Sequence, residues 1–327
     1  MKDPQTTYIP TVEAIQAAAD KLKGIASVSP LEKHIRFSDK YECNMLFKRE
    51  DLQQVRSYKI RGAYNKIASL TTDETKDGII CASAGNHAQG VALSCNLLKI
   101  KGTIYMPAPT PNQKIEQVKM FGKAYVEVVL VGDTFDDSFH KAMEECKKYG
   151  KPLVHPFNDS KVIEGQGTVG LEIVQQSKVP IDYIFIPVGG GGLASGLSSV
   201  VKALSPKTKI IGVEPAGAPS MSKSIEKGEI VKLTQIEKFV DGASVKRVGD
   251  LTFEICNKYL DEMTTVHEGK ICQTILEMYN KDAIVAEPAG VMSIAVLDGF
   301  KDEIKGKNVV CLVSGSNNDI TRTSEIE

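Results

Sequence analysis

Four consecutive glycines, Gly189, Gly190, Gly191 and Gly192, follow the apolar run YIFIPV (183–188) and precede a helix expected to extend to Leu204. Glycine lets backbone N–H groups approach an anion closely, and the N-terminus of the next helix adds partial positive charge. The segment therefore suits a phosphate group; the alternative is a tight turn. No Gly-Lys-Ser/Thr follows, and the GxGxxG dinucleotide pattern with its acidic partner is missing, so the phosphate belongs to another kind of ligand.

Two other polar segments also follow apolar runs directly. SAGNHAQG (83–90) follows GIICA (78–82), and its free N–H groups and serine hydroxyl suit a carboxylate, although Ser83 or Asn86 would serve equally well as a helix N-cap. SGSNND (314–319) follows NVVCLV (308–313); a hydroxyl here can donate to a heterocycle nitrogen, and the alternative is a simple turn. Lys59, in SYKIRGA (57–63), is not distinguished by its spacing from a surface lysine.

The elements that would position these segments alternate between strand and helix. Short apolar runs bounded by Gly, Pro or Ser predict strands, and the intervening periodicity predicts helices. Strands at 78–82, 103–106 and 126–131 precede helices at 88–98, 113–121 and 135–148, and further strands are expected at 183–188, 209–213 and 308–313. Continuous apolar strands indicate an α/β fold, with doubly wound parallel sheets covered by helices on both faces. Ligands of such sheets bind beyond the carboxyl ends of the strands.

The helix at 135–148 has the clearest pattern. Thr134 can cap its N-terminus and Gly150 can end it. One face carries its apolar residues, which are Phe135, Phe139, Ala142, Met143 and Cys146.

The composition and net charge of the chain argue against several classes of function. The 327 residues suggest two domains at about 150 residues each, and 40 basic against 41 acidic residues give a net charge of -1. We therefore expect neither a nucleic-acid partner nor a membrane, since no apolar run approaches the ~20 residues of a membrane helix and the N-terminus lacks a signal peptide. Seven scattered cysteines without a CxxC pair and five dispersed histidines indicate a cytoplasmic protein without a metal site.

Six segments, taken in order, resemble the threonine dehydratases, which are pyridoxal-phosphate enzymes of fold type II related to serine racemase and more distantly to cysteine synthase. The segments are SYKIRGA (57–63), SAGNHAQG (83–90), GQGT (165–168), PVGGGGL (187–193), AEPAG (286–290) and SGSN (314–317). The resemblance extends over nearly the whole chain. It implies a discontinuous large cofactor-binding domain, 1–75 and 158–327, and a small domain, 76–157, that binds the substrate carboxylate, with the cofactor in the cleft between them.

The resemblance also implies residue roles. Lys59 would carry pyridoxal 5′-phosphate and act as the catalytic base. Asn86 would contact the cofactor's 3-hydroxyl, Ser314 its ring nitrogen, and Glu287 would lie near the ring. The backbone amides expected to hold the phosphate are those of Gly189, Gly190, Gly191, Gly192 and Leu193. The group expected to bind the substrate carboxylate is Ser83 with the amides of Ala84, Gly85, Asn86 and His87.

This sequence departs from the family pattern at two places. Tyr58 stands where the family commonly has Phe, so its hydroxyl needs a partner. Ser316 stands where Gly is usual and is expected to add bulk near the ring nitrogen.

The implied activity is α,β-elimination of L-threonine to 2-oxobutanoate and ammonia, a step of isoleucine biosynthesis, with L-serine to pyruvate as a secondary reaction. A homodimer or homotetramer is expected. The alternatives are a serine racemase, a β-replacement synthase of the same fold, or a non-catalytic sensor of pyridoxal phosphate or amino acids. Racemisation is disfavoured, because Ala84 stands where serine racemase has a second serine. A strong magnesium or calcium site is disfavoured as well, because Ser220 replaces a racemase carboxylate.

Biosynthetic members of the family carry a C-terminal regulatory domain. Here the sequence ends at Glu327, in what is expected to be the start of a helix at 321–327.

Overall fold

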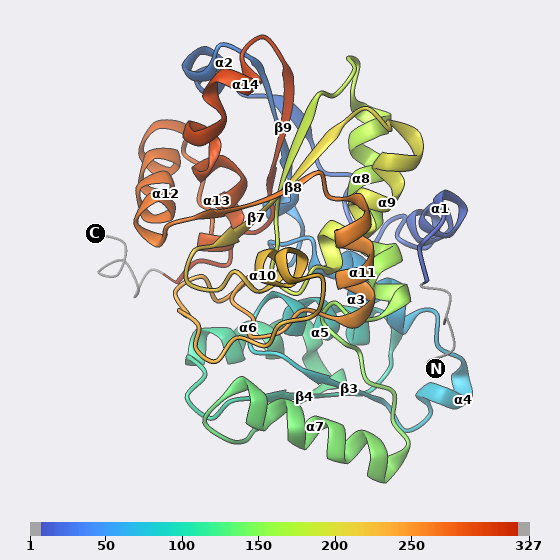
Figure 1. The fold of residues 1–327 in the computed structure, drawn as a ribbon. Coiled ribbons are helices and arrows are strands. Elements are labelled where there is room, and N and C mark those ends of the chain that lie inside the picture. The colour runs from blue at the N-terminus through green and yellow to red at the C-terminus, as the bar shows by residue number, and fades with distance from the viewer. Residues whose placement is uncertain (1–7, 320–327) are drawn as a thin grey trace.

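Two sheets organise the chain in a computed structural model that describes residues 8–319 (Figure 1). The helix start expected at 321–327 lies outside these residues. The six-stranded sheet has the order β1 (Leu31–Lys33), β2 (Asn44–Arg49), β9 (Asn308–Val313), β6 (Tyr183–Pro187), β7 (Lys209–Pro215), β8 (Glu262–Val266). The three-stranded sheet has the order β3 (Ile79–Ala82), β4 (Gly102–Met106), β5 (Val126–Leu130).

Helices connect and cover these strands. Their bounds are α1 (Val12–Lys21), α2 (Ile35–Tyr41), α3 (Lys59–Ile67), α4 (Thr72–Thr75), α5 (Asn86–Leu98), α6 (Asn112–Gly122), α7 (Phe135–Tyr149), α8 (Ser160–Gln176), α9 (Gly192–Leu204), α10 (Ser220–Lys227), α11 (Asp250–Tyr259), α12 (Glu268–Asp282), α13 (Pro288–Ala295) and α14 (Lys301–Ile304). Three short 3-10 turns are η1 (Glu50–Leu52), η2 (Lys123–Tyr125) and η3 (Leu297–Phe300).

All strand pairs in the two sheets are parallel except β1 with β2. The predicted α/β class and the predicted strands are therefore confirmed, and the antiparallel edge is a correction to the all-parallel expectation. β1 is only three residues long and mostly exposed. Such a strand needs no crossover helix and can pair antiparallel at an edge.

Both faces of each sheet are buried. In the large sheet Ile184 and Ile186 belong to one apolar cluster, with residues of α8 and α9, while Tyr183 and Phe185 belong to another, with residues of α12 and α13. In the small sheet the same alternation separates a cluster with α5 and α6 from a smaller one with α7. Because successive side chains point to opposite faces, this division places helices on both faces, as Figure 1 shows.

The prediction for the helix at 135–148 is mostly confirmed. Thr134 forms a capping box with Asp137, and Gly150 ends α7 in the left-handed conformation. Ala142 is buried in the core, but Phe135 is 45% exposed and stacks on Phe139 instead of entering it. Phe135 is the first residue of α7.

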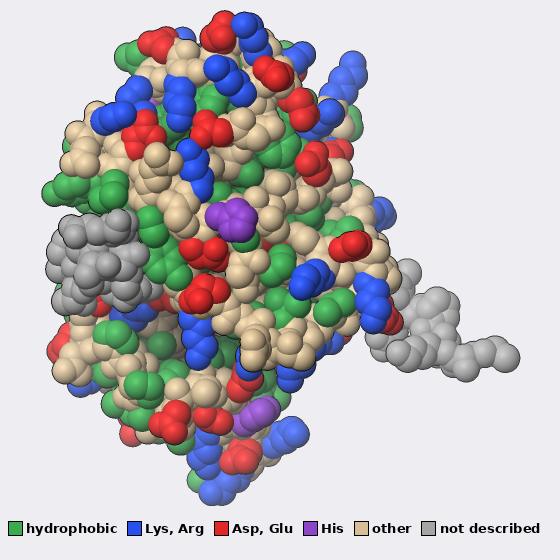
Figure 2. All heavy atoms as spheres, turned by 60° about the vertical axis from the view of Figure 1, so that its left-hand side comes forward, with side chains coloured by type: hydrophobic (Ala, Val, Ile, Leu, Met, Phe, Trp, Pro, Cys, Tyr) green, Lys and Arg blue, Asp and Glu red, His purple; other side chains and the backbone are tan. Residues whose placement is uncertain are grey.

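On the face shown in Figure 2, acidic and basic side chains are interspersed, as the net charge of -1 leads one to expect. No helix among residues 8–319 is long and apolar enough to cross a membrane.

Candidate active site

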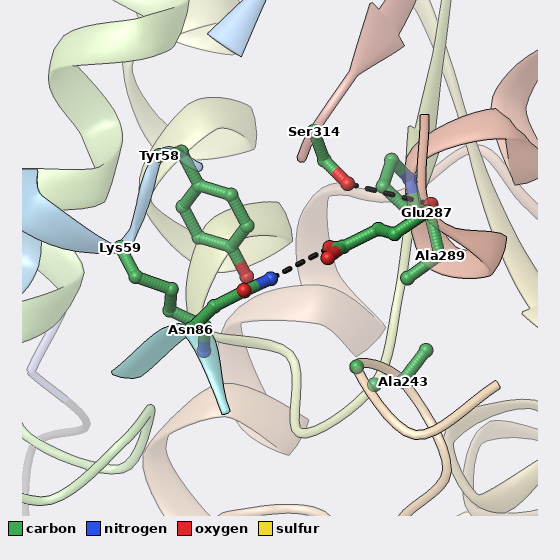
Figure 3. A pocket seen from close by; sticks show the side chains of 10 residues that line it. Tyr58, Lys59, Asn86, Ala243, Glu287, Ala289 and Ser314 are labelled. Atoms are coloured by element: carbon green, nitrogen blue, oxygen red, sulfur yellow. Dashed lines mark hydrogen bonds between the residues drawn. The ribbon is translucent and has the colours of Figure 1, made fainter. Parts of the chain in front are cut away.

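Loops from distant parts of the sequence meet around one pocket (Figure 3). The segments that follow β3, β6 and β9 all contribute to its wall, as the rule for parallel sheets predicts. The residues that line it are Tyr58, Lys59, Asn86, Pro187, Gly189, Gly242, Ala243, Glu287, Ala289 and Ser314. Five of the residues predicted from the sequence are therefore brought together here: Lys59, Asn86, Gly189, Glu287 and Ser314.

Lys59 is the first residue of α3, and its amine enters the pocket. The Nζ atom donates a hydrogen bond to the Pro156 carbonyl oxygen at 3.1 Å. Burial lowers the pKa of Lys59 to about 8, although the nearby Glu287 carboxyl opposes that shift. A lysine with a lowered pKa supplies neutral amine near neutral pH, which is the form that attacks a carbonyl carbon.

Within the described part of the chain, the backbone N–H groups of the glycine loop have no hydrogen-bond partner, and its neighbours leave no space for side chains at Gly190 and Gly191. Among residues 8–319 no acceptor is found for the backbone N–H groups from Gly189 to Leu193. A Cβ at Gly190 would lie 2.2 Å from the Phe157 ring, and one at Gly191, where φ is +89°, would lie 2.7 Å from Met221 Cε. The loop continues into α9, so its free amides and the helix N-terminus together suit an anion.

Asn86, Glu287 and Asn317 form a closed set of hydrogen bonds at one side of the pocket. Asn86 Nδ2 donates to Glu287 Oε1 at 2.6 Å, and the Asn317 amide donates to Glu287 Oε2 at 3.1 Å. Asn317 Nδ2 in turn donates to Asn86 Oδ1 at 2.7 Å. Burial raises the pKa of Glu287 to about 7, and the charge of Asp241 adds to the shift. This carboxyl can therefore hold or release a proton near neutral pH.

Ser314 directly follows β9 and is 2% exposed. Its hydroxyl donates to the Ala289 carbonyl oxygen at 3.3 Å, a long bond that leaves the hydroxyl available to another partner. Figure 3 shows it on the same side of the pocket as Glu287.

The expectation that Ser316 crowds the ring nitrogen is wrong. Its hydroxyl donates to the Asp51 carbonyl oxygen at 3.2 Å, and its amide donates to the Arg56 carbonyl oxygen. The side chain thus binds the segment after β2 and does not line the pocket. Tyr58 does line it, with the Lys59 amine 5.2 Å from its ring centre. No hydrogen bond to its hydroxyl is found within residues 8–319.

The predicted carboxylate-binding segment lies between β3 and α5, next to Asn86 in the chain. Ser83 Oγ accepts a hydrogen bond from the Gly85 amide at 3.3 Å, and neither Ser83 nor Ala84 lines the pocket. His87 is 2% exposed, and its Nε2 lies 2.9 Å from the Val154 carbonyl oxygen. Its side chain therefore packs at the helix start, with a pKa lowered to about 3 by burial.

Sequence reasoning missed several residues of the pocket wall. Gly242 and Ala243 come from the irregular segment 228–249, which carries no strand pattern or phosphate motif that could have indicated them. Ala289 lies inside the segment AEPAG, so a signal for it was present. Asn317, inside SGSN, does not line the pocket but contacts Asn86 and Glu287, which do.

The comparisons with known proteins define the class. The chain belongs to the pyridoxal-phosphate dependent enzymes, whose family model matches residues 23–315. It is 56% identical over 315 residues to the biosynthetic L-threonine dehydratase IlvA of Halalkalibacterium halodurans. This match covers 96% of this chain and 76% of that protein.

Solved structures agree with this assignment. Threonine deaminase isoform 2 of Solanum lycopersicum superposes with a TM-score of 0.90 at 39% identity, over 98% of this chain and 95% of that one. Maize serine racemase has a TM-score of 0.90 at 29% identity, over 97% of each chain.

The residues present fit pyridoxal phosphate. The glycine loop offers free amides to a phosphate, and the Lys59 amine, with its lowered pKa, offers attachment for an aldehyde. Among the described residues there is no cluster of three His, Cys, Asp or Glu side chains suited to a metal ion. Glu214 instead accepts hydrogen bonds from the amides of Met221 and Ser222 at the start of α10.

Proposed function

We propose that this chain converts L-threonine to 2-oxobutanoate and ammonia, and L-serine to pyruvate more slowly. The observation that carries the proposal is a lysine amine of lowered pKa in the same pocket as a glycine loop with free amides. The 56% identity to an L-threonine dehydratase supports the choice of substrate. The overall reaction balances without any co-reactant, since the water lost at the β-carbon is regained when the imine product is hydrolysed.

In this proposal Lys59 both attaches the cofactor and, once free, takes the proton from the substrate Cα. The bound cofactor supplies an electron sink for the charge left at that carbon. The free amides from Gly189 to Leu193 hold the phosphate, and Ser83 with the amides of 84–87 binds the substrate carboxylate. Asn86 and Ser314 orient the ring through its hydroxyl and its nitrogen.

Glu287 has a further role in the proposal. Its carboxyl is buried against Asn86 and has a pKa near 7, so it exchanges a proton with its surroundings within the working pH range. It thereby sets whether Asn86 Nδ2 donates to a charged or a neutral group, and this changes how firmly Asn86 is held.

We also propose the wider setting of the enzyme. Its domains are 1–75 with 158–327, and 76–157; all strands of the small sheet fall in the second of these and all strands of the large sheet in the first. The protein acts in the cytoplasm on a small-molecule substrate, in isoleucine biosynthesis, and forms a homodimer or homotetramer. Sedimentation analysis of the purified protein tests the last point.

A keto-acid assay tests the activity. The protein loaded with pyridoxal phosphate is incubated with L-threonine, L-serine and their D forms, and a sample reduced beforehand with borohydride serves as the control. We expect keto acid from L-threonine first, less from L-serine, and none from the reduced control. A yellow protein that forms no keto acid from either L substrate would instead identify a sensor.

A further inference from the structure

The GQGT segment, 165–168, belongs to the family resemblance but contributes no residue to the pocket wall. It lies in the first half of α8, and all four of its residues are buried. On one side α8 packs against α3, which begins at Lys59, and on the other against α9, which begins in the glycine loop. One helix therefore supports both the lysine and the loop.

Glycines bring the three helices into backbone contact. A Cβ at Gly165 would stand 2.5 Å from the Arg61 carbonyl oxygen of α3. A Cβ at Gly196 of α9 would stand 2.2 Å from the Ile163 carbonyl oxygen of α8. Neither glycine position has space for a methyl group, and a close-packed interior adjusts little to accommodate one. The distance between α3 and α9 is thus set by α8.

Arg61 fixes the position of α3 along α8. The side chain lies in the first turn of α3 and is 1% exposed. Its Nε and Nη2 atoms donate to the two Glu50 oxygens at 2.8 and 2.7 Å, and its Nη1 and Nη2 atoms donate to the two Glu172 oxygens at 2.6 and 3.0 Å. A further bond, from Nη1 to Thr168 Oγ1 at 3.1 Å, reaches the GQGT segment itself.

Lys48 completes a cluster of two cations and two carboxylates. Its Nζ atom donates to Glu172 Oε2 at 2.6 Å and to the Ser29 carbonyl oxygen at 2.7 Å. Burial alone would raise the pKa of Glu50, but the Arg61 guanidinium facing it brings that pKa below its ordinary value. A buried ion cluster of this kind is often no more stabilising than apolar packing of the same volume, so stability alone is a weak reason for its presence.

We propose that Arg61 is a positioning residue: its forked contacts to Glu50 and Glu172 hold the first turn of α3 against α8, and so hold the Lys59 amine at one place relative to the glycine loop. This inference rests on the proposed function, in which Lys59 attaches the cofactor. Lysine at position 61 would keep the charge but lose the planar fork that binds two carboxylates at once.

The test compares Arg61→Lys with wild type as holoenzymes. Because misplacement by about 1 Å can cost about 10²-fold in rate, we expect kcat per bound cofactor to fall about 10²-fold. KM should stay within about threefold, since the substrate-binding groups are unchanged. The visible circular dichroism of the bound cofactor should change as well, because it reports the asymmetry of the site independently of turnover.

A matched control is available in the same molecule. Arg36 in α2 also forks onto two carboxylates, those of Asp282 and Glu277 in α12, in contacts that involve no residue of the pocket wall. Arg36→Lys should leave kcat, KM and the dichroism at wild-type values. An equal loss in this control would show a general effect of weakening an ion pair and would overturn the inference.

A second variant keeps the test decisive if Arg61→Lys does not fold. Glu172→Gln preserves the size of a side chain that is 13% exposed and weakens the same fork. We expect a smaller loss of kcat with the same change in dichroism; wild-type values for both overturn the proposal.

Reduction with borohydride followed by peptide mapping separates the positioning role of Arg61 from the proposed function of the protein. A label on another lysine contradicts the proposed function, whereas a label on Lys59 with unaltered variants contradicts only the positioning role.

Discussion

Lys59 is a weaker base than an ordinary lysine because its amine is buried away from water, which disfavours the charged form. With a pKa of about 8, the neutral amine becomes the major form above that pH. The rate at which the cofactor attaches should therefore rise about tenfold per pH unit below this value and level off above it. Stopped-flow measurement of the visible band, after pyridoxal phosphate is added to the apoprotein, follows this rate. A rise that continues to about pH 10, as for an exposed lysine, would contradict the assignment.

Lys59→Ala should abolish steady-state dehydration of threonine, because it removes both the attachment point and the base. The fold should persist, since alanine suits the first turn of a helix. Far-ultraviolet dichroism and thermal unfolding check the fold, and a keto-acid assay checks turnover. Threonine turnover at the wild-type rate in this variant would refute the role given to Lys59.

Ala84 predicts elimination without racemisation. Inverting Cα requires a proton donor on the face opposite Lys59, and a methyl group can neither give nor take a proton. Chiral analysis after partial turnover of L-serine should find pyruvate and essentially no D-serine. Ala84→Ser should gain some D-serine formation. If wild type accumulates D-serine as fast as pyruvate, the racemase alternative is correct.

The sequence alone indicates a role for some of the pocket residues but not for others. The glycine loop could be interpreted from physical principles alone, because four consecutive glycines before a helix place unhindered amides beside its positive end. Lys59 and Glu287 could not, because a lysine or a glutamate acquires its role only from burial and from neighbours distant in the chain, such as Pro156 and Asn317.

Among the strands, all three of the small sheet and β6, β7 and β9 of the large sheet were predicted, whereas β1, β2 and β8 of the large sheet were not. β6 and β9 contain apolar runs buried on both faces, and so does the IIGV stretch of β7. β2 (NMLFKR) breaks this pattern with Lys48, which is fully buried only because Glu172 and carbonyl oxygens satisfy its amine. β8 (EMTTV) lies at an exposed edge and has little apolar character. A partner remote in sequence explains the buried Lys48 of β2, and exposure at the edge explains the polar character of β8, so the local pattern was not informative for either strand.

At the junction of β6 and α9, Gly191→Asp should reduce the affinity for pyridoxal phosphate by orders of magnitude. The new side chain would meet Met221 and Thr252 and would place a carboxylate against the phosphate site. Spectroscopic titration of the apoprotein measures the dissociation constant. Gly228→Asp is the control, because Gly228 also has a positive φ, of +73°, but has open space around its Cβ position. Wild-type affinity in Gly191→Asp would mean that the loop is only a turn.

For the whole molecule, the pocket lies where the two sheet units meet, and the irregular segment 228–249 closes part of it through Gly242 and Ala243. Two ion pairs link this segment to helices beside the small sheet: Lys114 of α6 with Asp241, and, more loosely at 3.8 Å, Asp136 of α7 with Lys246. Long connections without regular structure are often functional, and this one both lines the pocket and contacts the helices beside the small sheet.

Reversing the charge at Lys114 should therefore weaken substrate binding. Lys114→Glu sets a carboxylate against Asp241, and since a partly exposed pair contributes about 1 kcal/mol or less, we expect KM to rise up to about fivefold, and somewhat more from the added repulsion. The loss of a positive charge near Glu287 should also raise the pKa of that carboxyl further, because Lys114 lowers it.

The double variant Lys114→Asp with Asp241→Lys restores opposite charges and should return KM to within about twofold of wild type. Added salt should shrink the difference between the single variant and wild type, because screening acts on exposed charges. Lys76→Glu, in an exposed pair with Asp73 on α4, is the control and should leave KM unchanged. A single variant with wild-type KM at low salt, or a double variant no better than the single one, would show that this ion pair does not hold the segment over the pocket.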